Sequence, residues 1–299
     1  MKHVPRYGFT LLEVVFVVVV LGIVASIGSS VIVRVFESYI IQKATHNAAL
    51  KTELAINQLA NRLVYRIGQS VVARKADGSM LPLNSVDTTT SDDFNILEWI
   101  AYDNDSFSSS NLPGWSGFVD LDNSSSTKGV ISTGSDLAHA RTVISKLGGS
   151  AALNFVGITD YRTGVAKDIN CLHNTTGAGC IYPVDMSGTT LSLKGGDIVS
   201  GAMVFSEYYQ LARSAYAVVP VASTTIAGTW DLTLYYNYAP WTGQTFSTPG
   251  VSKSILLRNV SVFRFKSDSG NSIRIKLCTI ERISDTENIS ICKEKAVIR

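Results

Sequence analysis

Residues 8–33 read GFTLLEVVFVVVVLGIVASIGSSVIV, and this stretch decides the fold of the 299-residue chain. Residues 14–33 carry no charge, and as a helix they rise about 30 Å, the hydrocarbon thickness of a bilayer. Glu13 lies inside the apolar boundary, where an unpaired carboxylate costs about 2.5 kcal/mol or more toward the bilayer centre. The stretch therefore predicts a membrane-spanning helix in which Glu13 has a partner.

The leader before this stretch is short and basic, with Lys2, His3 and Arg6. A secretory signal has an apolar core of about 7 to 15 residues followed by a small-residue cleavage site, whereas here the run is longer and no such site closes it. Positive charge at the amino end keeps that end in the cytoplasm. In a two-membrane bacterium, the rest of the chain is then expected in the periplasm.

The basic leader followed by GFTLLE at residues 8–13 resembles the prepilin signature of type IV pilins and type II secretion pseudopilins. The resemblance implies cleavage between Gly8 and Phe9 by a prepilin peptidase and methylation of the new Phe9 amine. It also implies pairing of Glu13 with that amine on a neighbouring subunit. The implied partners are other pilin or pseudopilin subunits and an inner-membrane assembly platform.

Small residues recur every four positions in the span, at Gly22, Ser26 and Ser30. They share one helix face, where small side chains let helices approach closely in lipid. A single anchor with incidental small residues is the alternative, and the prepilin resemblance favours helix bundling. The chain has no proline between Pro5 and Pro82, so the helix can continue beyond the membrane.

After residue 33 the apolar residues follow a helical period, as in an amphipathic helix. Breaker residues at Gly78 and Pro82 predict that this helix ends near Arg74. The expected divisions are a leader (1–8), a transmembrane half-helix (9–33), an amphipathic half-helix (34–75) and a head (76–299).

Short β-branched and aromatic runs between polar turns predict a β-rich head. The expected strands are residues 94–102, 115–121, 202–209, 215–219, 229–238, 259–266, 272–280 and 289–298. The first two are expected to pair across Pro113-Gly114, and residues 135–147 to form a helix with Ser135 as N-cap. The fold class is α+β, with a long amino-terminal helix, transmembrane in its first half, packed on an antiparallel β-rich periplasmic head.

The four cysteines lie beyond the span, in a compartment where disulfides persist. Cys278 and Cys292 flank a turn near residues 284–288 almost symmetrically, so we predict that they pair, and that Cys171 pairs with Cys180. His173 lies between the latter two. Zinc sites favour cysteine gaps of two to four residues, and this gap holds eight, which favours a disulfide loop over a metal site.

Composition and motifs exclude several function classes. Without the leader the chain has 26 − 2 = 24 basic and 24 acidic side chains, so nucleic acid is not an expected partner. The four histidines fall in no zinc-protease, hydrolase or phosphate-loop pattern, so we expect no enzyme, no catalytic residues and no cofactor.

Residues 120–124, Asp-Leu-Asp-Asn-Ser, offer oxygen ligands at alternating spacing, as a calcium loop needs. The glycine and closing glutamate of an EF-hand are missing. Asp103 and Asp105 would add ligands only if the fold brought them close. Turn capping is therefore favoured, and no metal is predicted.

Apolar and basic residues alternate on both sides of a turn at residues 269–271, which places them on opposite faces of a hairpin. The basic set is Arg264, Lys266, Arg274 and Lys276. Neutralisation by acids such as Glu281 and Glu294 is favoured. The alternative is a docking face for an acidic subunit or, in a DNA-uptake pilus, for phosphates.

The expected function is filament assembly. A head of more than 200 residues is bulky for a subunit that repeats along a filament, which favours a minor pilin-like subunit of a type II secretion pseudopilus or a type IV pilus. The signature alone does not separate these two systems. The alternative is a membrane-anchored periplasmic binding protein that does not polymerise, in which Glu13 has another membrane partner.

Overall fold

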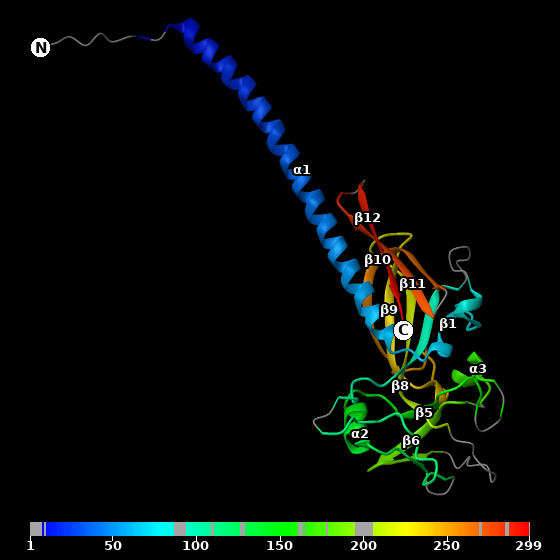
Figure 1. Cartoon of the computed structure of the whole chain (residues 1–299). Coiled ribbons are helices and arrows are strands. Elements are labelled where there is room, and N and C mark those ends of the chain that lie inside the picture. The colour runs from blue at the N-terminus through cyan, green and yellow to red at the C-terminus, as the bar shows by residue number, and fades with distance from the viewer. Residues whose placement is uncertain are drawn as a thin grey trace, which may run out of the picture.

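The computed structural model describes residues 8, 10–86, 94–108, 111–125, 129–160, 164, 166–177, 179–194, 206–268, 271–284 and 287–298. Residues 1–7 of the leader, Phe9, and residues 202–205 of one expected strand lie outside the described residues. The fold is α+β: a long amino-terminal helix, α1 (Leu11–Val64), joins a head built on an antiparallel sheet (Figure 1).

Helix α1 has 54 residues, which corresponds to a length of about 80 Å. It ends at Val64, so the predicted end near Arg74 is wrong. The backbone N–H of Ile67 donates to the carbonyl of Ile100 at 2.8 Å, and Arg66 forms a bridge with Ala101. Pairing with a strand thus replaces helical hydrogen bonds, although the apolar spacing continues to Ile67.

The two halves of α1 have different surroundings. Residues 11–43, the free half, are all exposed, and Figure 1 shows this part standing away from the head. Residues 44–64, the packed half, lie across strands β10 (Ser252–Asp268), β11 (Ser272–Arg282) and β12 (Asn288–Val297). The buried side chains of this half include Ile56, Leu59 and Leu63, which join the largest apolar core of the head. The predicted packing of the helix on the sheet is confirmed.

Five long strands form the part of the sheet on which α1 packs at one edge. They are β8 (Tyr209–Ala222), β9 (Trp230–Tyr238), β10 (Ser252–Asp268), β11 (Ser272–Arg282) and β12 (Asn288–Val297). Each pairs antiparallel with its sequence neighbour. The predicted segments at 229–238, 259–266, 272–280 and 289–298 fall within the last four of these strands or overlap them closely.

Strand β8 connects this part of the sheet to the rest of the head. Its first residues pair with β5 (Ala152–Phe155), and further along it pairs with β3 (Ile96–Tyr102). Strand β3 also pairs with β1 (Val72–Arg74), which pairs with β2 (Met80–Pro82). The 3-10 turns η1 (Gly68–Ser70), η2 (Leu83–Ser85) and η3 (Pro240–Thr242) surround this region.

The end of the head farthest from the start of α1 is built from short strands and two short helices (Figure 1). Its elements are β4 (Val130–Ile131), α2 (Leu137–Lys146), β5, α3 (Ile169–Leu172), β6 (Tyr182–Ser187) and β7 (Thr190–Leu193). Helix α2 packs its buried residues Leu137, Ala140 and Ile144 in a second core with side chains of β5 and β6. The helix predicted at 135–147 therefore covers part of the sheet, as expected.

Two local predictions about this region are wrong. Residues 115–121 form no strand beyond one bridge, between Phe118 and Tyr208, because β1 and β8 occupy both sides of β3. The N-cap of α2 is Asp136, whose carboxylate accepts the N–H of His139 at 3.0 Å. The hydroxyl of Ser135 instead accepts the N–H of Ser116.

Candidate functional site

The start of α1 has the geometry of a capping box. The N–H of Glu13 donates to Thr10 Oγ1 at 3.3 Å, and Glu13 Oε2 accepts the N–H of Thr10 at 3.3 Å. The carboxylate therefore lies at the positive end of the helix dipole, next to the point where the predicted cleavage would create an amine. Gly8 precedes this cap, and Phe9 lies outside the described residues.

The predicted contact stripe lies on the free half of α1. Gly22, Ser26 and Ser30 are exposed, and beyond the backbone of its own helix a methyl group added to Gly22 would meet no atom of the described residues within 4 Å. Ser30 Oγ donates to the carbonyl of Ile27 at 2.8 Å, so its hydroxyl is satisfied inside the helix. A window of eighteen residues in α1 has a mean hydropathy of 2.7 and no buried residue, so the helix is long and apolar enough to cross a membrane.

Residues 5–29 match the family described as the prokaryotic N-terminal methylation motif. The chain carries the signature of type IV pilins and pseudopilins. This match confirms the resemblance found in GFTLLE and the basic leader. No curated protein and no solved structure matches the chain.

The pilin signature belongs to structural proteins rather than enzymes. It implies processing by a prepilin peptidase and assembly with other pilins. The match ends within the free half of α1, so it describes the helix and not the head. What the head contributes has to be argued from its own geometry.

The head contains the two disulfides that were expected. Cys278 and Cys292 face each other in the register of β11 and β12, with Cα atoms 4.0 Å apart. Cys171 is bonded to Cys180 with Cα atoms 5.3 Å apart, and the ring of His173 faces Glu98 of β3. All four cysteines of the chain are therefore in disulfides.

The residues weighed for calcium have other roles. The carboxylate of Asp120 accepts both the backbone N–H and the side-chain amide of Asn123, and these bonds lower the pKa of Asp120. Asp105 pairs with Arg213 at 2.9 Å, and Asp103 Oδ1 lies 3.6 Å from the same guanidinium. Among the described residues, no group of three or more His, Cys, Asp or Glu side chains is placed to hold a metal ion.

The basic hairpin face is largely compensated. Arg264 lies opposite Lys276 and Lys266 opposite Arg274, as the alternation predicted. Arg274 pairs with Asp268 at 2.8 Å and with Glu294 at 3.2 Å, while Lys266 lies 3.6 Å from Asp268. Glu281 instead pairs with Lys51 of α1.

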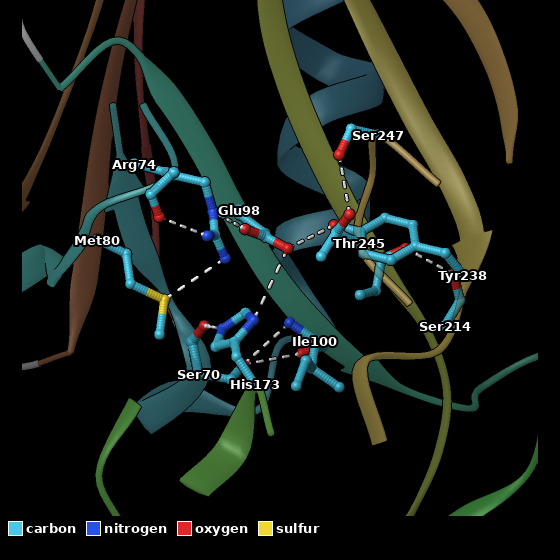
Figure 2. Close-up of polar contacts among 12 residues, drawn as sticks. Ser70, Arg74, Met80, Glu98, Ile100, His173, Ser214, Tyr238, Thr245 and Ser247 are labelled. Carbon is cyan, nitrogen blue, oxygen red and sulfur yellow. Dashed lines mark hydrogen bonds and ion pairs between the residues drawn. The ribbon is translucent and has the colours of Figure 1, made fainter. Parts of the chain in front are cut away.

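A buried polar cluster, which the sequence analysis did not predict, lies where β1, β3, β9 and the Cys171–Cys180 loop meet (Figure 2). Glu98 is 1% exposed. Its Oε2 accepts from Arg74 Nε at 2.6 Å, and its Oε1 accepts from the Tyr238 hydroxyl at 2.8 Å. His173 Nδ1 lies 3.7 Å from the same Oε1. Burial raises the pKa of Tyr238 well above its ordinary value, so the phenol stays protonated.

The head also contains a cleft of about 1080 Å³. It lies between the η1 and η2 turns, the end of β5 and the residues that lead into α3. Its lining includes Lys167, whose Nζ donates to Asn154 Oδ1 at 3.1 Å and to the carbonyl of Phe155. Burial lowers the pKa of Lys167 to about 8, against the effect of the nearby Asp160.

Proposed function

We propose that this protein is a minor pilin-like subunit, a pseudopilin in the broad sense, of a type II secretion pseudopilus or a type IV pilus. It is inserted in the inner membrane with its head in the periplasm, cleaved between Gly8 and Phe9, methylated at Phe9, and taken into a filament by the assembly platform. Its role is structural rather than catalytic, and it uses no cofactor.

One observation carries this proposal: the methylation motif stands at the start of a helix whose first half has no partner in the described head. Residues 14–33 of this half carry no charged side chain, and a helix segment that is apolar on every side is stable only in lipid or among other apolar helices. The free half of α1 is 33 residues long, so it reaches about 50 Å beyond the packed half. Lipid before assembly and neighbouring subunits after assembly provide the missing contacts.

The head supports a minor role. It holds twelve strands among the described residues and projects to one side of α1 (Figure 1). A subunit that repeats every few ångströms along a helical bundle needs a head that neighbouring copies can accommodate. This argument rests on analogy with other filament subunits.

The proposal is tested by the mature amino terminus. Intact-mass measurement of the protein purified from membranes should show the chain starting at methylated Phe9. The matched variant Gly8→Leu changes the residue before the cleaved bond, and a Cβ at Gly8 would meet no atom of the described residues within 4 Å, so the described fold should be unaffected. That variant should keep its leader. Wild-type protein that retains residues 1–8 in assembled filaments would contradict the proposal.

A further inference from the structure

We propose that the side chains of Lys167 and Asn154 become joined by an isopeptide bond in the folded protein. The Lys167 amine attacks the side-chain amide carbon of Asn154, and one ammonia leaves. The bond ties β5 to a residue thirteen positions further along the chain. The inference concerns the head alone, and it does not depend on filament assembly.

The two side chains meet at the wall of the cleft. Lys167 Nζ donates to Asn154 Oδ1 at 3.1 Å and to the backbone carbonyl of Phe155. The first of these bonds places Nζ next to Asn154 Cγ, the carbon that carries Oδ1. Lys167 is 9% exposed and Asn154 is 5% exposed, so little water reaches the contact. Groups held this close react without the entropy cost of finding each other.

The backbone fixes the position of both side chains. Asn154 pairs with Gln210 of β8 in the register of the sheet, and its Nδ2 donates to Gln210 Oε1 at 3.2 Å. This bond turns Oδ1, rather than Nδ2, toward Lys167. The N–H of Lys167 donates to the carbonyl of Ile158 at 2.8 Å, which holds the lysine beside the chain that continues β5. The reacting groups are therefore positioned before the reaction begins.

The Lys167 amine is neutral more often than that of an ordinary lysine, and only the neutral amine is a nucleophile. Burial lowers the pKa of Lys167 to about 8, although the nearby Asp160 acts in the opposite direction. At pH 7 about one molecule in ten then has the neutral amine, against fewer than about one in a thousand for an ordinary lysine. Rotation about the Cε–Nζ bond turns the lone pair of that amine toward Asn154 Cγ.

The carboxylate of Asp160 can carry the proton that the reaction has to move. Asp160 is 2% exposed, it accepts a hydrogen bond from the Tyr182 hydroxyl, and its charge acts on Lys167. When the Nζ–Cγ bond forms, Nζ loses a proton to the carboxylate. Asn154 Nδ2 gains that proton as the Cγ–Nδ2 bond breaks, so ammonia leaves. An amine and a primary amide thus give a secondary amide and ammonia, and no oxidant or other reagent is needed.

A second contact of the same kind shows why burial matters. Lys295 Nζ donates to Asn57 Oδ1, and Asn57 Nδ2 donates to the carboxylate of Glu53 at 3.1 Å. The same three groups are present there, but Lys295 and Asn57 are only half-buried, and the Glu53 side chain is 46% exposed. A lysine that water reaches keeps its proton. We therefore expect a bond at Lys167 and none at Lys295.

The bond would stabilise the end of the head that is built from short strands. Strand β5 has four residues, and Lys167 lies just before α3. The two disulfides of the head open under reduction, whereas an amide does not. The cross-link between residues 154 and 167 would therefore persist in the reduced and unfolded chain.

Mass spectrometry of the full chain, purified from membranes in detergent, tests the proposal. After reduction, the intact mass should be lower than that of the sequence, counted from its observed amino terminus, by the mass of one ammonia. Trypsin does not cut after an acylated lysine. The peptide map should therefore contain residues 147–162 joined to residues 163–194, while cleavage after Lys295 remains.

Matched variants identify the reacting groups. Lys167→Arg keeps a positive charge and N–H donors but has no amine that forms the bond, so it should show no loss of ammonia. Lys194→Arg, at an exposed lysine that pairs with Asp185, should lose ammonia as the wild type does. Asp160→Asn removes the group that carries the proton and should lower the linked fraction of freshly made protein about tenfold or more.

The wild-type protein decides the matter if a variant does not fold. An intact mass with no loss of ammonia, together with tryptic cleavage after Lys167, would overturn the proposal. A bond at Lys295 would overturn it as well, because burial would then not select the reacting lysine.

Discussion

The free and packed halves of α1 are one continuous helix with opposite relations to the rest of the molecule. In the free half the apolar side chains point in every direction and are exposed, as Leu21 and Ile27 are at 60%. In the packed half the buried side chains form one stripe: Leu59, on the stripe, is 1% exposed, whereas Leu54, off it, is 64% exposed. The head therefore buries the apolar side chains of the packed half, whereas those of the free half need an apolar partner outside the head.

Charged side chains of the two halves also differ in their partners. Glu53 of the packed half pairs with Lys293 of β12 at 3.4 Å, and Lys51 pairs with Glu281 of β11. In the free half, Glu13 is held by its own helix start, through Thr10. A carboxylate in an apolar helix needs a cation once it is buried, and the amine of a neighbouring subunit is the partner that the proposed function supplies.

The largest effect is expected for Glu13→Leu. Loss of an ion pair in a low-dielectric bundle should lower incorporation into filaments about tenfold or more, while cleavage of the leader and stability of the head stay unchanged. Quantitative blotting of sheared filaments against the membrane pool measures this. Glu37→Leu removes another exposed carboxylate of the free half and serves as the control.

Wild-type incorporation of Glu13→Leu would contradict the pairing and favour a membrane-anchored protein that does not polymerise. Reduced incorporation of both variants would show that the effect is not specific to the helix start.

The second effect is on the free energy of unfolding of the head, which should depend on which of three leucines of α1 is replaced. Leu59→Ala should lower the free energy of unfolding of the head by about 2–5 kcal/mol, because it leaves a cavity beneath the helix. Leu54→Ala and Leu21→Ala should each change it by less than about 0.5 kcal/mol, because both side chains are exposed. Urea unfolding of the detergent-solubilised chain, followed by tryptophan fluorescence, measures this, since Trp99 lies in the same core as Leu59. Equal effects at Leu59 and Leu54 would contradict the assignment of the packed face.

The third effect concerns the disulfide between β11 and β12, the strands on which the packed half of α1 lies. The Cys278–Cys292 bond closes a loop with a sequence separation of 14, so replacing both cysteines with alanine should destabilise the head by about 3 kcal/mol in the chain-entropy model. Cleavage of the leader should not change. Non-reducing peptide mapping checks the pairing, and free thiols or crossed pairs would contradict it.

The part of the sheet formed by β9 to β12 could largely be predicted from the sequence, because its strand pairings are local. Strands β9 to β12 are long, each pairs with its sequence neighbour, and apolar residues such as Leu232 and Leu234 alternate with polar ones. The part of the head that contains β4 to β7 has shorter strands. One of them, β5, pairs with β8, which lies far away in the sequence. Alternation over two to four residues carries too little information to predict such strands.

The sites differ in the same way. The pilin signature is contiguous, so the sequence contained all of it. The Glu98 cluster draws its members from four places in the chain, and no local pattern joins them. One signal was available: Glu98 interrupts the apolar run of β3 between Leu97 and Trp99, and a charge at a buried strand position implies a partner. The position of His173 between two cysteines suggests a metal site as the alternative to a disulfide loop, but in the structure its ring faces Glu98 and Ser70.

The central claim is that the free half of α1 is a contact surface between subunits, and cysteine crosslinking tests it most directly. All four native cysteines are in disulfides, so a cysteine introduced at Ser26 can react with its counterpart on a neighbouring subunit. Ser26→Cys lies on the stripe of small residues, and Val24→Cys lies about 160° around the same helix. Oxidation of membranes that contain the assembly machinery should give covalent dimers for Ser26→Cys, several-fold more than for Val24→Cys. Equal crosslinking at the two positions, or none at either in assembled filaments, would contradict the claim.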